Sequence, residues 1–229
     1  MKNIAIAIDG PAASGKSTTA KLVAQRLGYV HLDTGAMYRA ITLGVLKEGI
    51  DVSARKKVED FAESAKIVVE ADDTHANKIY LNEKNVTAEI RSPIVTRNVS
   101  TISGYEGVRK VLVREQRRMA AQGGIVLEGR DIGTVVLPSA ELKIFMVAAV
   151  SERARRRKKD LLSAGIDVAD EELVKEIEER DRKDSTRSLS PLKMAEDAIK
   201  LDTSSLTIDE QVDFIVKRAR TMIGAGGSR

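Results

Sequence analysis

The sequence predicts an α/β protein in which short strands alternate with helices and one small antiparallel insert interrupts the pattern. A short apolar run at 4–9 leads directly into a glycine-rich loop, and a helical pattern begins at once. Further apolar runs then alternate with helical stretches, as in a sheet whose strands are joined by crossover helices. The stretch 63–100 breaks this alternation with closely spaced β-like runs and turns, which indicates an insert at a sheet edge.

The size and composition are those of a globular protein that works without thiol chemistry. The 229 residues, 42% hydrophobic and 31% charged, suffice for one domain with a sizeable core. No cysteine is present, which excludes disulfides and favours a reducing cytoplasm. No apolar run approaches the roughly 20 residues of a membrane span, and the amino end is not laid out as a signal peptide. We expect a cytoplasmic monomer without a membrane partner, and the formal charge of +4 does not demand nucleic acid.

The loop after the first apolar run fits a phosphate-binding template at every fixed position. Gly10 and Gly15 allow a tight turn whose backbone N–H groups reach phosphate oxygens. Lys16 adds a cation for the β- and γ-phosphates, and the hydroxyl of Ser17 can bind Mg²⁺. The helix at 17–27 points its positive end at the anion. The residues expected to bind ATP are the whole loop: Gly10, Pro11, Ala12, Ala13, Ser14, Gly15, Lys16, Ser17 and Thr18.

The remaining elements follow in order. Strands are expected at 29–33, 66–70, 78–82, 125–128, 142–147 and 198–202, with turns at 71–77 and 82–85 and a further strand starting at Val86. Helices are expected at 34–47, 52–64, 93–100, between Gly104 and Gly123, from a cap at Ser151 to Gly165, over 170–184, and from a capping box at Thr207 and Glu210. The predicted organisation is a core of 1–62 and 101–223, an insert of about 63–100, a lid of about 151–187 and a disordered tail at 224–229.

Polar residues follow two of the predicted strands at their carboxyl ends, where open α/β sheets bind ligands. Asp33 and Thr34 end one strand, and the alternative for Asp33 is a helix cap. Arg130 and Asp131 lie on a glycine-bounded loop after another strand, and the alternative is a surface ion pair. His31 is interpreted as a strand residue rather than a catalyst.

Two charged helices near the end of the chain are predicted to form the lid. The first carries a dense run of arginine and lysine at 153–159, and the second has only a thin apolar stripe. A helix with so little apolar surface buries little, so we expect it to be mobile. The alternative is that these charges only form a solvated face.

Absent motifs narrow the phosphate chemistry. The sequence has neither the N-K-x-D and D-x-x-G motifs of a GTPase nor the strand ending in Asp-Glu of a motor ATPase. Small-molecule phosphoryl transfer remains, and it requires two anionic ligands held together away from water. Arginines at helix ends and in loops can supply bidentate phosphate contacts, namely Arg39, Arg109, Arg130, Arg180 and Arg187.

Four motifs, in this order, closely resemble the bacterial cytidylate kinase family. They lie at 8–18, 32–39, 128–136 and 179–187, and the resemblance extends over essentially 4–223. It implies a P-loop nucleoside monophosphate kinase fold, with a five-stranded parallel sheet, helices on both faces, a monophosphate-binding insert and a helical lid. It also implies phosphoryl transfer from ATP to CMP or dCMP with Mg²⁺, giving CDP or dCDP.

The resemblance further implies roles for individual residues. The phosphate of CMP would be held by Arg39 and Arg130, with Arg187 close by and Thr34 as a further CMP contact. Cytosine would be read by Ser100, Arg109 and Asp131, and the ribose held by Arg180 and Asp184. The residues expected to act on the transferring phosphoryl group are Lys16, Arg130, Arg156, Arg180 and Arg187, with Arg156 closing from the lid. For Mg²⁺, Ser17 and Asp33 are expected.

Other functions stay open at this point. A kinase for UMP, AMP or shikimate would share the loop and fold, although Asp131 favours cytosine, whose N4 amino group a carboxylate can accept. A nucleic-acid-binding module using 153–159 is a different class, and the aromatic content of 3% leaves few stacking platforms for it. A nucleotide-sensing scaffold without turnover is a third possibility.

Overall fold

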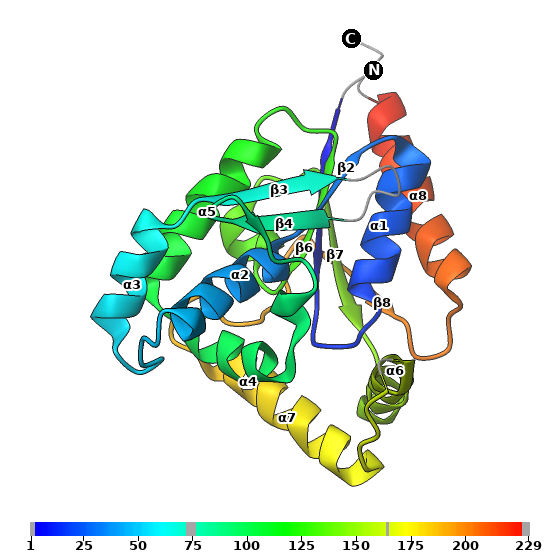
Figure 1. The fold of residues 1–229 in the computed structure, drawn as a ribbon. Coiled ribbons are helices and arrows are strands. Elements are labelled where there is room, and N and C mark those ends of the chain that lie inside the picture. The colour runs from blue at the N-terminus through cyan, green and yellow to red at the C-terminus, as the bar shows by residue number, and fades with distance from the viewer. Residues whose placement is uncertain (1–2, 72–76, 164, 226–229) are drawn as a thin grey trace.

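The computed structural model describes residues 3–71, 77–163 and 165–225, and it confirms the α/β fold (Figure 1). Five parallel strands form the central sheet in the order β2-β6-β1-β7-β8. They are β1 Ala5–Asp9, β2 Val30–Asp33, β6 Ile125–Gly129, β7 Leu142–Val147 and β8 Ile199–Asp202. Because all neighbouring pairs are parallel, the carboxyl ends of the strands meet at one edge of the sheet.

Helices cover both faces of this sheet. On one face, Ile6 and Ile8 of β1 share a buried cluster with side chains of α1 (Lys16–Leu27) and α8 (Ile208–Ala225). On the other, Ala7 packs in a second cluster with side chains of α2 (Thr34–Lys47) and α5 (Glu106–Ala120). A strand covered on both sides has no polar face, which explains why the first strand is a continuous apolar run.

The insert forms a separate antiparallel sheet beside the edge strand β2. Its strands are β3 Ile67–Ala71, β4 Asn77–Leu81 and β5 Lys84–Asn85. The side chain of Asn77 links the two sheets, because it accepts from Asp33 N at 2.7 Å and donates to His31 O at 2.8 Å.

The prediction of a four-residue turn and a strand starting at Val86 is wrong by two residues. Asn82 and Glu83 both have positive φ, 47° and 67°, and they make a two-residue hairpin turn. The third strand therefore begins at once, at Lys84. The predicted turn residues 72–76 lie outside the described part of the chain.

The remaining elements are α3 Arg55–Ser64, a 3₁₀ turn Glu89–Arg91, α4 Pro93–Ile102, a π-helical turn Ile132–Val136, α6 Val150–Ser163 and α7 Asp170–Thr186. Three predicted helix boundaries shift. Asp51 Oδ1 accepts from the backbone N and hydroxyl of Ser53, and this turn delays α3 to Arg55. Helix α6 starts at Val150, so Ser151 lies in its first turn and does not cap it. Helix α8 continues through the first two residues of the predicted tail, and 226–229 lie outside the described residues.

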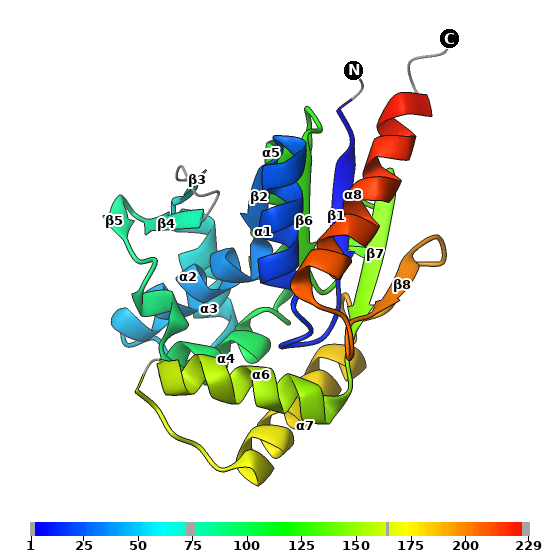
Figure 2. The same cartoon turned by 90° about the vertical axis from the view of Figure 1, so that its right-hand side faces the viewer.

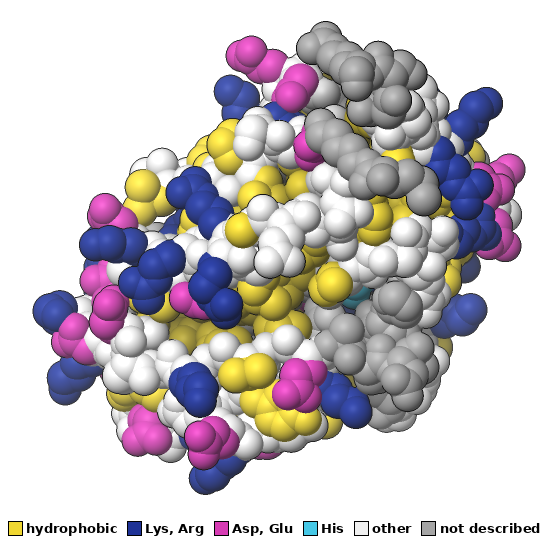
Figure 3. All heavy atoms as spheres, turned by 90° about the horizontal axis from the view of Figure 1, so that it is seen from above, with side chains coloured by type: hydrophobic (Ala, Val, Ile, Leu, Met, Phe, Trp, Pro, Cys, Tyr) yellow, Lys and Arg dark blue, Asp and Glu magenta, His cyan; other side chains and the backbone are white. Residues whose placement is uncertain are grey.

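Helices α6 and α7 lie across the end of the sheet at which the carboxyl ends of its strands meet (Figure 2). They pack against each other through a small cluster of their own, formed by Ala154, Leu173 and Ile177. At the opposite end of the molecule, charged side chains of both signs are interspersed on the surface that the structure describes (Figure 3). Within the described ranges, no helix is long and apolar enough to cross a bilayer.

Candidate active site

A cavity of about 770 Å³ lies between the carboxyl edge of the sheet and helices α6 and α7. The residues that line it come mainly from the glycine-rich loop, the start of α2, α4, α5, the end of β6 with the segment after it, helices α6 and α7, and the start of α8. Most of the predicted site residues are among them: Ala12, Ala13, Gly15, Lys16, Ser17, Thr18, Asp33, Thr34, Arg39, Ser100, Arg109, Arg130, Asp131, Arg156, Arg180, Asp184 and Arg187. The sheet topology thus brings together residues up to 175 positions apart in sequence.

The other three predicted loop residues shape the loop rather than line the cavity. A Cβ on Gly10 would lie 2.1 Å from the backbone oxygen of Met146, so only glycine fits beside β7. Ser14 is fully buried, and its hydroxyl donates to Pro11 O at 3.1 Å. These contacts hold the turn tight, which keeps its backbone N–H groups near the cavity.

Lys16 folds back onto its own loop. Its Nζ donates to Pro11 O at 2.7 Å and lies 3.4 Å from Ser14 Oγ. Burial lowers the pKa of Lys16 to about 7, and the positive charge of Arg130 acts in the same direction. An anion bound at the loop would raise the pKa of Lys16 again and stabilise its ammonium form, so the site favours a phosphate group.

The carboxylate that touches Ser17 belongs to Glu128, at the end of β6. Ser17 Oγ donates to Glu128 Oε2 at 2.7 Å, and His31 Nε2 lies 3.1 Å from Oε1. Burial acts to raise the pKa of Glu128, but the hydrogen bond from His31 and the nearby Lys16 ammonium hold it below its ordinary value. His31 is thus a buried strand residue, as predicted, and it also orients Glu128.

Asp33 is a helix cap, which was the alternative interpretation of this residue. Its Oδ1 accepts from Ala36 N at 3.1 Å, so Asp33 caps α2. Burial and the charge of Glu128 raise its pKa. Glu128 was predicted only as the end of the strand 125–128, and a carboxylate in that position is a candidate ligand that the sequence alone does not separate from Asp33.

Two ion pairs form the part of the cavity farther from the loop. Asp131 pairs with Arg109, and both side chains are almost fully buried. Arg109 also donates to Ser103 O at 3.4 Å, and its guanidinium lies 5.7 Å from the ring centroid of Tyr38.

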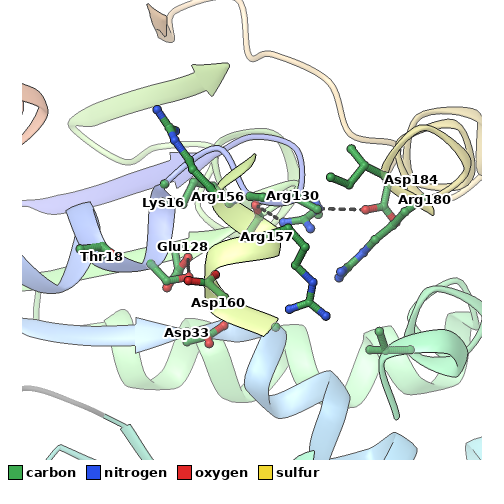
Figure 4. Close-up of a pocket in the computed structure, with 18 of the residues that line it drawn as sticks. Lys16, Thr18, Asp33, Glu128, Arg130, Arg156, Arg157, Asp160, Arg180 and Asp184 are labelled. Atoms are coloured by element: carbon green, nitrogen blue, oxygen red, sulfur yellow. Dashed lines mark hydrogen bonds and ion pairs between the residues drawn. The ribbon is translucent and has the colours of Figure 1, made fainter. Parts of the chain in front are cut away.

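Arg130 pairs elsewhere, which excludes the alternative of an ion pair with its neighbour Asp131. Its Nε donates to Asp184 Oδ2 at 2.9 Å (Figure 4), and Ser100 Oγ lies 3.4 Å from Asp184 Oδ1. Asp184 is buried, and although burial acts to raise its pKa, the charges of Arg130 and Arg180 hold it below its ordinary value.

Several arginines converge on the space between the loop and these pairs. Arg39 donates to Thr96 Oγ1 at 2.8 Å and Ile90 O at 3.2 Å, which holds it between α2 and α4. Burial lowers the pKa of Arg39 to about 10. Burial, followed by the charges of Arg130 and Arg39, lowers the pKa of Arg180 to about 9.

The buried Nε of Arg180 has no hydrogen-bond partner in the part of the chain that the structure describes. The positive charges of these arginines repel one another and lower one another's pKa, so an anion bound among them would be stabilised. Arg187 borders the same space, where it donates to Ser190 O at 2.6 Å and lies 3.4 Å from Ser103 Oγ.

The lid helix α6 contributes more than the predicted Arg156. Arg156 donates to Thr203 O at 2.6 Å and extends away from Arg130 and Arg180, whereas Arg157 is directed toward that group (Figure 4). Arg153, which begins the predicted basic run 153–159 but was not predicted as a site residue, is buried and donates to Ala12 O at 3.2 Å.

Arg153 also pairs with Asp181 at 2.6 Å, and in this way it connects the glycine-rich loop to both lid helices. Beside the glycine-rich loop, Gln211 accepts from Thr19 at 2.8 Å and lines the wall together with Thr207. Neither Gln211 nor Thr207 was predicted to belong to the site.

Fold and site together define a P-loop kinase that acts on small molecules. The loop at Lys16 is built for a triphosphate, and the arginine group beyond it is a second anion site in the same cavity. The position of both at the carboxyl edge of a parallel sheet is that of ligand sites in open α/β proteins.

Comparison with known proteins agrees with this class and narrows it. The cytidylate kinase family matches residues 6–221. Cytidylate kinase from Limosilactobacillus reuteri is 53% identical, over 94% of this chain and 95% of that protein. Cytidylate kinase from Lactococcus lactis subsp. cremoris is 52% identical, over 97% and 100%. The chain therefore belongs to the cytidylate kinase family, as its four motifs predicted.

A distant similarity to a solved structure adds no argument about function. Shikimate kinase from Bacteroides thetaiotaomicron is 12% identical, with a TM-score of 0.49 over 96% of this chain and 98% of that chain.

Proposed function

We propose that this protein transfers the γ-phosphoryl group of ATP to CMP or dCMP, giving ADP and CDP or dCDP. The observation that carries the proposal is the buried Arg109–Asp131 pair, which borders the same cavity as the phosphate loop. A carboxylate accepts from the N4 amino group of cytosine, whereas the O4 carbonyl of uracil would face it repulsively. The guanidinium donates to the acceptor atoms of the base, O2 and N3.

The donor nucleotide binds at the loop Gly10–Thr18. Its phosphates accept from the loop N–H groups and from Lys16, which leaves Pro11 O to do so. Ser17 and Glu128 would hold Mg²⁺, with Asp33 nearby, since hydroxyl and carboxylate oxygens are the donors that this ion prefers. When bound, the ion neutralises charge on the β- and γ-phosphates.

The acceptor binds at the arginine group, with its phosphate on Arg39, Arg130 and Arg187 and its ribose near Arg180 and Asp184. Thr34 and Ser100 complete this part of the wall. An oxygen of the CMP phosphate attacks the γ-phosphorus, and the bond from that phosphorus to the bridging oxygen of ADP breaks. Arg130, Arg180 and Lys16 stabilise the charge on the transferring group, which is the main demand of this chemistry.

The lid, about 151–187, and the insert, about 63–100, close over the two nucleotides and exclude water from the γ-phosphoryl group. Closure brings Arg156 from Thr203 onto the phosphates of ATP. We place the enzyme in the cytoplasm, which its lack of cysteine supports, and expect it to act as a monomer.

The test is an assay of ADP release with ATP and Mg²⁺ against CMP, dCMP, UMP, AMP, GMP and shikimate. We expect the highest kcat/KM with CMP or dCMP. Preference for another acceptor would leave the fold standing and overturn the roles given to Arg109 and Asp131. ATP binding without turnover of any acceptor would overturn the kinase function.

A further inference from the structure

Asp9 is the last residue of β1 and directly precedes the phosphate loop, but its side chain bonds to the segment after β6. The residue is buried, and its two carboxylate oxygens accept from different backbone N–H groups. Oδ1 accepts from Ile132 N at 2.8 Å, and Oδ2 accepts from Gly133 N at 2.7 Å. These two donors directly follow Arg130 and Asp131 in the chain.

The sheet topology explains why this contact exists. Strand β1 lies between β6 and β7, and Asp9 is in register with Gly129 on one side and Phe145 on the other. Because these strands are parallel, the chain that leaves β6 must pass over β1 to reach the start of β7, and it begins this passage beside the carboxyl end of β1. The crossing segment, 130–137, carries Arg130 and Asp131 and then forms the π-helical turn. Asp9 lies at the point where this segment crosses.

The contact is tight and needs a carboxylate. A Cβ on Gly133 would lie 3.4 Å from Asp9 Oδ2 and 3.1 Å from Lys143 Cδ, so the segment is seated closely on both side chains. Lys143 fixes the other end of the segment, because its Nζ donates to Pro138 O. An amide in place of the carboxylate has one accepting oxygen, and its NH₂ group would face the second N–H donor.

We propose that Asp9 is a positioning residue for recognition of the acceptor base. By bonding to Ile132 and Gly133 it fixes the segment that carries Asp131, so the strand leading into the ATP loop also sets acceptor specificity. The inference rests on the proposed function, because it assumes that Asp131 reads cytosine.

The test compares kcat/KM for CMP and UMP in Asp9→Asn. A displaced segment should lower kcat/KM for CMP by about 10²-fold, since small misplacements of a positioning group cost about that much. Arg130 lies on the same segment and holds the phosphate of either acceptor, so kcat/KM for UMP should also fall, but by less than about tenfold. We therefore expect the CMP/UMP ratio to fall at least about tenfold, while KM for ATP changes less than about threefold. The ratio does not depend on the fraction of enzyme that is folded, which separates positioning from stability.

Two further variants make the result decisive. Ile6→Val, in the core of the same strand and without contact to the segment, should lower the melting temperature and leave the CMP/UMP ratio unchanged. Asp9→Ser, neutral and smaller, replaces Asp9→Asn if the amide prevents folding, with the same expected fall in the ratio.

Asp131→Ala serves as the reference, because it removes the base contact itself. If the ratio falls in Asp131→Ala and stays within about twofold of wild type in the Asp9 variant, the proposal for Asp9 is overturned while base recognition stands. If the ratio is unchanged in both variants, the role of Asp131 fails, and the proposal for Asp9 fails with it.

Discussion

Removing Asp131 should cost the enzyme both stability and specificity, and the two losses can be measured separately. The side chains of Arg109 and Asp131 are only 7% and 6% exposed. Truncation of one partner leaves a buried charge unpaired, which typically costs about 3–5 kcal/mol. Arg109 keeps its contacts with Ser103 O and the ring of Tyr38. We therefore expect Asp131→Ala to lie near the lower end, about 3 kcal/mol.

Urea unfolding, followed by circular dichroism at 25 °C, measures this loss. The matched control is the double variant Arg109→Met, Asp131→Leu, because replacing both members of a buried pair by apolar groups is often neutral. The double variant should regain most of the stability and still lack the preference for CMP. That preference can reach about 10⁴-fold where the wrong base leaves a buried polar group unpaired. A stability loss below about 1 kcal/mol in Asp131→Ala would contradict the unpaired-charge argument, and an unchanged CMP/UMP ratio would contradict base reading.

Three further outcomes follow from single contacts. Burial raises the pKa of Asp9 to about 6, although the hydrogen bonds from the backbone N–H groups of Gly133 and Ile132 act to lower it. The folded state therefore binds this proton more tightly than the unfolded chain, so the part of the stability that comes from binding the proton, about 3 kcal/mol, is full below about pH 4 and lost as pH rises through about 6. Unfolding free energies from pH 4 to 7 should show this slope in the wild type and not in Asp9→Asn. Lys16→Met should lower kcat by at least about 10²-fold without unfolding the protein, and near-wild-type turnover would refute its role on the transferring phosphate. Thr207 Oγ1 and the carboxylate of Glu210 bond each other's backbone N–H, so Thr207→Ala should cost about 1 kcal/mol in urea unfolding, and no loss would show that this cap is not stabilising.

The order of strands and helices was predictable because each element carries its own local signal. Strand β1 reads as an apolar run since both of its faces are covered, and the loop after it has a fixed spacing of Gly10, Gly15 and Lys16. The capping box at Thr207 likewise fixed the start of α8. The hairpin at Asn82 and Glu83 was misplaced because a two-residue turn with positive φ at a glutamate has no strong sequence signature.

The carboxylate beside Ser17 could not be identified in the same way. Asp33 and Glu128 both end buried strands and look equivalent along the chain. The choice between them depends on the strand order β2-β6-β1, which places the strand of Glu128 next to β1 and that of Asp33 one strand farther away. Strand order is a long-range property of the sheet, and local periodicity does not contain it.

For the arginine run of α6, by contrast, the spacing in the sequence does predict which side chains face the site. Arg153, Arg156 and Arg157 are spaced i, i+3 and i+4, so they share one face of a helix, whereas Arg155 and Lys159 lie off it. The structure follows this spacing: Arg153 is buried, Arg156 and Arg157 are half-buried, and the other two are exposed.

Two sets of contacts join the phosphate loop, or the residue before it, to the segment of Asp131 and to helices α6 and α7. Asp9, just before the loop, bonds the segment that carries Asp131. Ala12, within the loop, accepts from Arg153, which pairs with Asp181 beside Arg180. A phosphate-binding motif alone fixes where the donor binds. Because these buried contacts join the loop to the segment of Asp131 and to helices α6 and α7, we expect them to set where the acceptor and the arginines of α6 lie relative to the donor in the proposed reaction, and in-line transfer depends on that relation.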